Sequence, residues 1–411
     1  MTSRERVWRA INHQRPDRVP IDLGAMRASG ISVTVYDRLK KRCGLDTPTK
    51  VLDSMQLLAE VEPEMLQRLH VDVVPLEGAL AAWSGMPHSA GVRKRLPSGV
   101  TAYFPPGTRI RREADESWVL LDPSARPYAR MPRDGFYFDF IRPTMTGRRI
   151  DPGTYRPDDT VGDEELEAFA RRARHLHEDT DKAVLGWGAS ISLFGLSALL
   201  SENITQGSLD EWLCMLLAEK PTAHEMMARC VDAAIARARL YHQAAGDRVM
   251  IWGVASDDAG TQRAGLVSPE TFREMVLPHY RRFCDWIHRN TPWKTFLHSC
   301  GSVHDYIQGW IDAGVDILNP VQISAADMDP PRLMRDFGGK VVFWGGGCDT
   351  QKVLPLGTPE AVRRHVRDNL DAFGAREGGF VFTQVHNIQP NVPVENVEAM
   401  LQAACEYGTN P

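Results

Sequence analysis

Short apolar, β-branched runs alternate with longer amphipathic segments along most of this chain, and no other feature constrains the fold as strongly. Buried parallel strands have this apolar character, and a helix between two such strands makes a βαβ unit. Eight candidate strands can be marked, at residues 18–23, 71–75, 184–188, 249–254, 295–299, 315–318, 341–344 and 380–385. Eight strands alternating with helices predict an α/β fold, a closed (β/α)8 TIM barrel, with an open doubly wound sheet as the alternative.

One stretch interrupts the alternation. Roughly a hundred residues separate the second and third candidate strands, which is too long for a plain loop. Residues 100–104, 109–113 and 117–121 alternate apolar and polar side chains between turn residues, so they predict a β-meander. We expect one TIM-barrel domain over residues 1–411, with a β-rich insertion between strands 2 and 3 at about 77–181. Near the barrel mouth, that insertion would cover the site, bind a partner or only stabilise the fold.

Composition limits the classes of function. With 43% hydrophobic residues in 411, the chain can bury a large core. Its formal net charge is −5, and it has no block of Lys and Arg, so we expect no nucleic-acid partner. Seven scattered cysteines indicate reduced thiols. Without an apolar leader or a long apolar run, we expect a cytoplasmic protein with no membrane partner; a homodimer is left open.

A possible metal site follows two of the candidate strands. The period of a strand puts His298 and Cys300 on one face at its C-terminal end, before a glycine turn. Cys348 follows the glycines at 345–347, after a later strand. One imidazole and two thiolates with an open fourth position are typical of catalytic zinc. The alternative is ordinary packing of buried Cys and His, but strand C-terminal ends are where α/β barrels hold their chemistry.

Further polar residues follow the neighbouring strands. Asp257 and Asp258 end the fourth strand, and His386 ends the eighth. A carboxylate can complete a zinc site or orient a ligand imidazole, and a histidine can donate or accept a proton near neutral pH. We therefore assign these three residues to catalysis. The alternatives are a helix N-cap for the two aspartates and a hydrogen-bonded loop for His386.

A substrate pocket can be assigned around the same strand ends. Asn387 and Gln389 directly follow His386, and we expect both to bind substrate. Trp187 and Trp252 lie near the ends of the third and fourth strands and are expected to line an apolar wall. The alternative for both tryptophans is the hydrophobic core.

Several motifs resemble the uroporphyrinogen decarboxylase superfamily. They are the opening at 4–20, the helix start at 268–270 with its Leu-Pro at 277–278, the turn at 348–349 and the ending at 387–396. The similarity covers most of the chain outside 77–181. True decarboxylases grip substrate carboxylates with an Arg-Gln-Ala-Gly-Arg element. This chain has Gly24-Ala25-Met26-Arg27-Ala28-Ser29-Gly30 instead, which lacks the second arginine, and it has Asp72 near the position of their central aspartate. The resemblance implies that Arg27 and Asp72 bind substrate.

The His-X-Cys and the distant cysteine resemble the branch of corrinoid-dependent methyltransferases. In that branch the matching residues bind zinc, which implies zinc at His298, Cys300 and Cys348. The implied activity is transfer of a methyl group between a small methylated substrate, favoured to be methoxylated, and the cobalt of a corrinoid. No Asp-X-His-X-X-Gly run is present, so a separate corrinoid protein is the expected partner. The alternatives are a methylcorrinoid:thiol methyltransferase, a decarboxylase-like lyase and a non-catalytic barrel with structural zinc.

Overall fold

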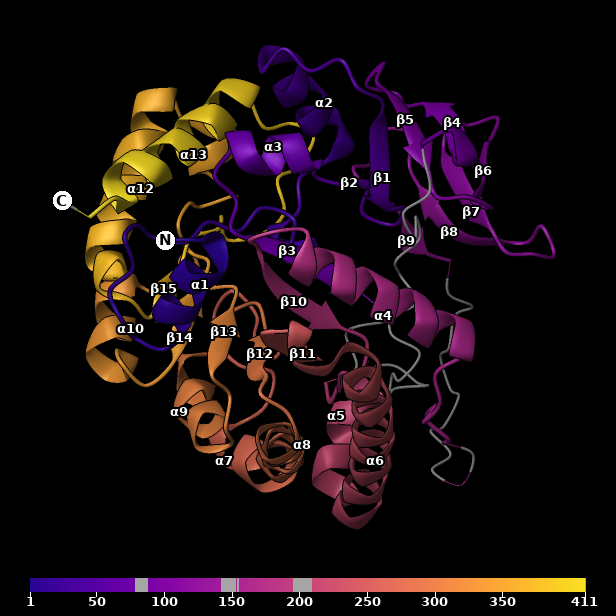
Figure 1. Ribbon diagram of the computed structural model, residues 1–411. Coiled ribbons are helices and arrows are strands. Elements are labelled where there is room, and N and C mark those ends of the chain that lie inside the picture. The colour runs from indigo at the N-terminus through magenta and orange to yellow at the C-terminus, as the bar shows by residue number, and fades with distance from the viewer. Residues whose placement is uncertain (78–87, 142–152, 154, 195–208, 411) are drawn as a thin grey trace.

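A curled parallel sheet forms the centre of the computed structural model, which describes residues 1–77, 88–141, 153, 155–194 and 209–410 (Figure 1). Its seven strands run in the order β15-β14-β13-β12-β11-β10-β3. They are β3 (Val73–Glu77), β10 (Ala183–Trp187), β11 (Ile251–Ser256), β12 (Lys294–His298), β13 (Ile317–Asn319), β14 (Val342–Trp344) and β15 (Phe380–Val381). Each lies at one of the predicted strands.

The first candidate strand closes the ring between the two edge strands. Phe382 donates its N–H to the carbonyl of Pro20, and Asp22 donates to the carbonyl of Phe382, both at 2.8 Å. On the other side, Asp72 donates to the carbonyl of Ile21 at 2.8 Å. The predicted α/β barrel is therefore confirmed, with a short extended segment in place of a regular eighth strand.

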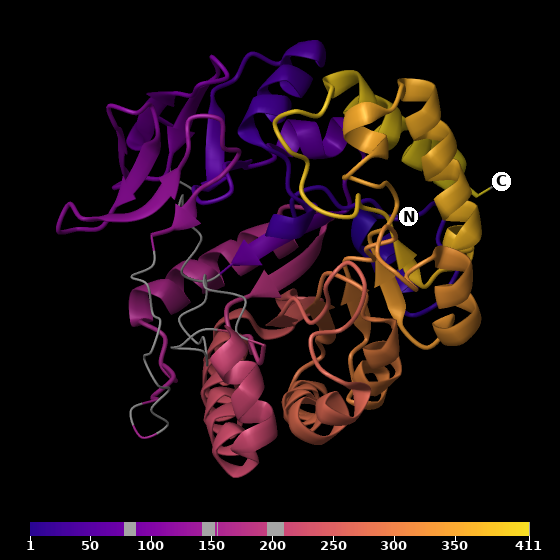
Figure 2. The ribbon, with the colours of Figure 1, turned by 180° about the vertical axis from the view of Figure 1, so that it is seen from behind.

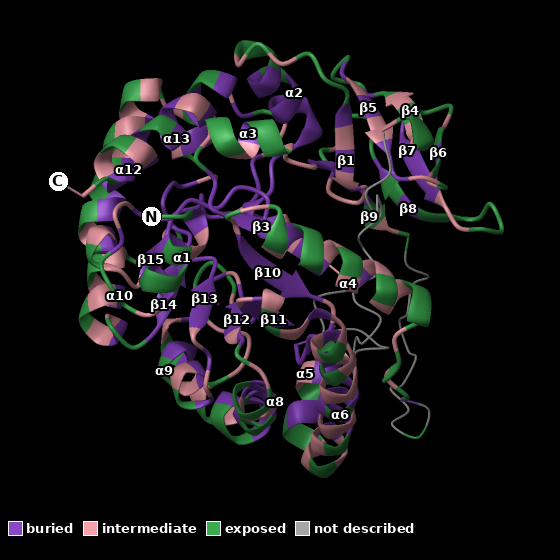
Figure 3. Cartoon of the chain, in the orientation of Figure 1, coloured by how far each residue is buried: buried purple, intermediate pink, exposed green. Residues whose placement is uncertain are grey.

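Helices surround the strands (Figure 1). They are α1 (Ser3–Ile11), α2 (Val33–Arg42), α3 (Pro63–Arg68), α4 (Asp163–Glu178), α5 (Leu209–Ala218), α6 (Lys220–Ala245), α7 (Pro269–Thr271), α8 (Leu277–Asn290), α9 (His304–Asp312), α10 (Pro330–Phe337), α11 (Val353–Leu356), α12 (Pro359–Ala372) and α13 (Val394–Gly408). Their buried faces turn toward the sheet (Figure 3). Within the described parts of the chain, no helix has the length and apolarity to cross a bilayer.

Two glycines set which face of the sheet each large aromatic side chain occupies. A Cβ at Gly253 would lie 2.0 Å from the ring of Trp187, and a Cβ at Gly186 would lie 2.7 Å from the ring of Trp252. Trp187 packs in the barrel interior, whereas Trp252 packs in the outer core and stacks on Trp293 at 4.3 Å between ring centroids. The expectation that Trp252 lines the substrate pocket is therefore wrong, because it faces the helices.

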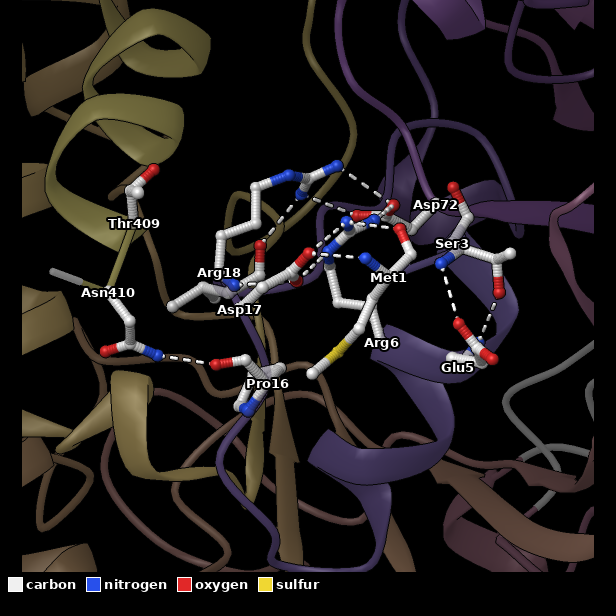
Figure 4. A network of polar contacts seen from close by, with 12 residues as sticks. Met1, Ser3, Glu5, Arg6, Pro16, Asp17, Arg18, Asp72, Thr409 and Asn410 are labelled. Atoms are coloured by element: carbon white, nitrogen blue, oxygen red, sulfur yellow. Dashed lines mark hydrogen bonds and ion pairs between the residues drawn. The ribbon is translucent and has the colours of Figure 1, made fainter.

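The N-terminal end of the barrel is plugged by α1 and by a buried ion network. Val7 and Ile11 of α1 pack against the interior residues of the strands. Asp72, which is fully buried, directly precedes β3 and accepts hydrogen bonds from Arg6 at 2.8 Å and from Arg18 at 2.7 Å (Figure 4). Asp72 was expected to bind substrate; it lies instead at the end of the barrel opposite the strand C-termini, where it pairs with two arginines.

Two small sheets lie to one side of the barrel, beyond α2 (Figures 1 and 2). One has the order β2-β1-β5-β4 and the other β6-β7-β8-β9. Their strands are β1 (Thr49–Asp53), β2 (Leu58–Ala59), β4 (Val92–Arg95), β5 (Thr101–Phe104), β6 (Arg109–Arg112), β7 (Trp118–Leu121), β8 (Pro127–Met131) and β9 (Asp139–Phe140).

The pairing of these strands differs from a single meander. β5 pairs in parallel with β1 and antiparallel with β4, whereas β6 and β7 belong to the other sheet. β1 and β2 precede the expected insertion at 77–181, and α4, inside those bounds, contacts β3 and β10 of the barrel. Residues 78–87, 142–152 and 154 of that expected insertion lie outside the described residues.

Candidate metal centre

His298 is the last residue of β12, and its ring is held in one orientation. Nδ1 lies 2.8 Å from Oδ1 of Asn319, the last residue of β13. Nδ2 of Asn319 donates to the carbonyl of Trp344 at 2.9 Å, so its Oδ1 must face the histidine. Nδ1 of His298 is therefore the donor, so in the neutral imidazole Nε2 carries the lone pair that can bind a cation.

Cys300 brings a sulfur atom beside that lone pair. Its Sγ lies 3.7 Å from Nε2 of His298. Zinc bonds of about 2.3 Å to sulfur and about 2.0–2.1 Å to nitrogen, in a tetrahedral arrangement, separate the two ligand atoms by about 3.6 Å. Gly301 directs the chain away at a φ of +97°, and a Cβ there would lie 2.2 Å from the carbonyl oxygen of Gly260. The spacing of the two donors therefore fits a single zinc ion.

His386 is the third donor at this point. Among the described residues, the ligand atoms of His298, Cys300 and His386 all lie within 4.8 Å of one another. The two imidazole rings are 6.0 Å apart between centroids. Burial, together with the neighbouring His298, holds the pKa of His386 below its usual value, which favours the neutral imidazole that binds metals.

Asp258 borders the same cluster. One carboxylate oxygen accepts the backbone N–H of Cys300 at 3.0 Å and lies 3.7 Å from Nε2 of His298. Its side chain is 47% exposed, so the cluster opens toward solvent on this side. Burial and the Asp258 carboxylate raise the pKa of the Cys300 thiol well above its usual value, and a bound cation would reverse that preference.

Asp257 turns away from the cluster. Its buried carboxylate accepts hydrogen bonds from the Ser192 hydroxyl at 2.8 Å, from the Tyr280 hydroxyl at 3.1 Å and from the backbone N–H groups of Leu193 and Phe194. Burial raises its pKa to about 7. The geometry favours a role in holding the segment after β10 over contact with a metal.

Cys348 is buried in the turn after β14 and is not a member of the three-residue group found among the described residues. Its Sγ lies 3.9 Å from the carbonyl of Asp349, and its own carbonyl accepts the N–H of Val385 at 2.9 Å. The backbone of Cys348 is thus joined to the residue preceding His386. Its role as a zinc ligand stays a prediction.

An aromatic layer lies beneath the mouth. Trp187 ends β10 inside the barrel and contacts Phe296 edge-on at 6.2 Å, and Phe296 contacts Trp344 in the same way at 5.4 Å. The indole N–H of Trp344 donates to Asp22 at 2.9 Å. Trp187 therefore belongs to the apolar layer inside the barrel, and its contact with substrate stays a prediction.

Three other residues were predicted to bind substrate: Arg27, Asn387 and Gln389. They lie at the end of the barrel that holds the strand C-termini and form polar contacts with one another or with β1 and the turn that follows it. Nε of Arg27 lies 2.5 Å from Asp53 of β1, and its Nη2 lies 3.7 Å from Glu77 at the end of β3. Asn387 donates to Gln56 at 2.5 Å and accepts a hydrogen bond from Gln389. These contacts attach β1 and its turn to the barrel.

Asn319 is the functional residue that the sequence analysis missed. It ends β13 and is followed by Pro320, so the signal used for the aspartates, a polar residue at a strand C-terminus, applied to it as well. Without the fold, nothing distinguished its amide from other polar strand ends. Its contact with His298 identifies it as the residue that orients this imidazole, which is predicted to bind zinc.

Known proteins similar to this chain include both decarboxylases and methyltransferases. The chain is 25% identical to a methylated-thiol--coenzyme M methyltransferase of Methanosarcina mazei over 44% of its length and 48% of that protein, so the match spans about half of this relative. It is 22% identical to a uroporphyrinogen decarboxylase of Magnetococcus marinus over 99% of its length and 98% of the relative. A solved methyltransferase from Methanosarcina mazei shares the fold, with a TM-score of 0.54, 16% identity and 99% coverage of both chains.

A family model described as uroporphyrinogen decarboxylase (URO-D) matches residues 139–407. That range begins at β9 and runs through α13, so it contains β10 to β15 and all three donors of the cluster. Most of the barrel is therefore included, and this chain belongs to the uroporphyrinogen decarboxylase family.

Proposed function

We propose that this protein is a zinc-dependent methyltransferase that moves a methyl group between a small methylated substrate, favoured to be methoxylated, and the cobalt of a corrinoid carried by a separate protein. The observation that carries the proposal is the 3.7 Å approach of His298 Nε2 and Cys300 Sγ at the C-terminal end of β12, beside His386. The methyltransferase name of one relative supports methyl transfer, alongside relatives that are named decarboxylases.

His298 and Cys300 would hold the zinc, with Cys348 as the further ligand that the resemblance implies. Zinc at this position would supply a Lewis acid for the heteroatom that carries the methyl group. Asn319 accepts the N–H at Nδ1 of His298, so the Nε2 of the neutral imidazole is aimed at the site. Trp187 offers an apolar floor, and His386 is placed to exchange a proton with the heteroatom at its ring nitrogen.

A second candidate is methyl transfer to a thiol. The Methanosarcina mazei relative is named for a methylated thiol and for coenzyme M, which favours sulfur as the heteroatom. Zinc sites with thiolate ligands accept a further thiolate readily, because sulfur donors suit this cation. The same residues would serve transfer of the methyl group to cobalt and transfer from cobalt to a thiol, and only the substrate would differ.

The lyase alternative has less support at the site, although relatives are named for it. A decarboxylase needs cations free to bind substrate carboxylates, and the guanidinium of Arg27 is already beside Asp53 and Glu77. Asp72 lies at the opposite end of the barrel. A purely structural zinc is disfavoured because such sites are closed by four protein ligands, whereas this cluster borders the 47% exposed Asp258.

A spectroscopic assay tests the proposal. Zinc-loaded protein, a reduced corrinoid protein and a panel of methoxylated compounds and methylated thiols are mixed, and conversion of cobalt(I) to methylcobalt(III) is followed by absorbance. We expect conversion with at least one compound and its collapse in His298→Ala. The control is His175→Ala, which removes an exposed histidine paired with Asp179 on α4. Decarboxylation of uroporphyrinogen without any methyl transfer would support the lyase instead.

A further inference from the structure

We propose that His386 is an exchangeable ligand of the metal: its imidazole completes the site with His298 and Cys300 in the resting protein and gives way to the heteroatom of the substrate. This inference rests on the zinc of the proposed function. It goes beyond that function because it names the side chain that occupies the substrate's position on the metal before substrate binds.

The first support is the position of the three donors. Their ligand atoms lie within 4.8 Å of one another, although His386 follows β15 and the other two residues belong to β12 and its turn. Two strands, β13 and β14, lie between β12 and β15 in the sheet. The imidazole therefore faces the other two donors from across the mouth.

The second support is the rigidity of the backbone that carries His386. Val385 donates to the carbonyl of Cys348 at 2.9 Å, and Ile388 donates to the carbonyl of Gly30 at 2.9 Å. The residues on both sides of His386 are thus pinned to neighbouring segments. A ligand exchange at this position needs only a rotation of the side chain, and the fold stays unchanged.

The third support comes from the other donors nearby. Asp258 already accepts the N–H of Cys300, and the Sγ of Cys348 lies at the carbonyl of Asp349 within its own buried turn. The imidazole of His386 is thus the donor that the geometry places beside the first two.

Donor charge explains why this ligand would leave when the substrate is a thiol. With Cys348 as the further ligand, the zinc would be held by two thiolates and two neutral imidazoles. An incoming thiolate carries a charge that attracts the cation, whereas a neutral imidazole does not, so binding of the thiolate would favour release of His386. The thiol proton must be lost as its sulfur binds, and the freed imidazole nitrogen of His386 is the nearby base that accepts it.

Cobalt(II) substitution tests the inference without requiring turnover. The whole protein, His386→Ala and the control His304→Ala are loaded with cobalt(II) in place of zinc. His304 is a matched control, because it is also partly buried and pairs with Asp336 on another helix. The readouts are the ligand-field absorption, cobalt affinity from competition with a chelator, and the titration of the thiol-to-cobalt charge-transfer band with 2-mercaptoethanol.

We expect His386→Ala to change the ligand-field spectrum and to lower cobalt affinity by at least the roughly 10–100-fold seen when a partner of a ligand is lost. It should also bind 2-mercaptoethanol more tightly than the unaltered protein, because no ligand has to be displaced. His304→Ala should match the unaltered protein in all three readouts.

An unchanged spectrum and affinity in His386→Ala would overturn the inference, as would weaker binding of 2-mercaptoethanol, which indicates that His386 acts only as a base. Failure of the unaltered protein to bind cobalt(II) would overturn both the inference and the proposed zinc. Normal spectra in a protein that transfers no methyl group would support the ligand and reject the proposed function.

Discussion

At the scale of the residue, one amide decides which nitrogen of His298 can bind a metal. Asn319 accepts from Nδ1 because its own Nδ2 is fixed on the carbonyl of Trp344. A buried asparagine side chain thus orients one imidazole ring. Such outer partners control ligand orientation and basicity in metal sites.

Asn319→Ala should therefore weaken metal binding by about 10–100-fold, because the ring of His298 loses the acceptor that fixes its tautomer. Zinc affinity from chelator competition measures the effect. Asn396→Ala is the control, since it removes a buried asparagine bonded to the carbonyls of Leu354 and Gly357 on the outside of the barrel. Equal zinc affinity in both variants would remove Asn319 from the site.

At the scale of the element, the side of the sheet on which a strand places its large side chain decides whether that side chain lies in the barrel interior or in the outer core under the helices. Gly253 leaves room for Trp187 inside the barrel, and Gly186 leaves room for Trp252 outside it. These two glycines lie on adjacent strands, and Gly186 is the register partner of Trp252. One residue of shift along either strand would exchange the two faces.

Gly253→Ala should destabilise the protein by about 1–3 kcal/mol, the usual range for an overfilled core, and should displace Trp187 from the floor of the mouth. Urea unfolding measures the stability, and the methyl-transfer assay measures the effect on the mouth. Gly186→Ala forces a methyl group against Trp252 on the opposite face, so it should lower stability without altering turnover at saturating substrate. Equal effects of both variants on turnover would contradict the assignment of Trp187 to the pocket floor.

The sequence predicted the strands better than it predicted which way their side chains face. The apolar runs located seven strands and the closing segment, because burial on both faces leaves a clear compositional signal. It could not assign Trp252, because β11 is buried on both faces, so its sequence shows no apolar–polar alternation that would tell the barrel interior from the helix side. Asp257 and Asp258 are adjacent in sequence, yet one holds a neighbouring segment and the other borders the cluster. The different roles of these two neighbouring aspartates depend on tertiary contacts, which the sequence alone does not show.

At the scale of the whole molecule, the two ends of the barrel have separate tasks. The N-terminal end is closed by α1 and by Asp72 with its two arginines, and the C-terminal end holds the donors. This division is general in α/β barrels, where one end stabilises and the other carries the chemistry. Asp72 was assigned to substrate binding from the family resemblance alone, although its position at the start of the candidate strand 71–75 already indicated the N-terminal end of the barrel.

Asp72→Ala should lower the free energy of unfolding by about 3–5 kcal/mol, because it removes the buried carboxylate that pairs with Arg18 and Arg6, of which only Arg6 keeps a second carboxylate partner, Asp17, among the described residues. Asp285→Ala, which removes an exposed partner of Arg289 on α8, should change it by about 0–1 kcal/mol. Urea unfolding compares the two variants. The folded fraction of Asp72→Ala should still bind zinc normally, and loss of zinc from that fraction would show that the two ends are coupled.

The most direct test of the account is the zinc content of the purified protein and of its ligand variants. We predict about one zinc per chain in the unaltered protein. Cys300→Ala and Cys348→Ala should each lose most of it while retaining the circular dichroism spectrum of the folded barrel. Full zinc retention in both variants, or an unaltered protein that remains metal-free after exposure to zinc, would contradict the account.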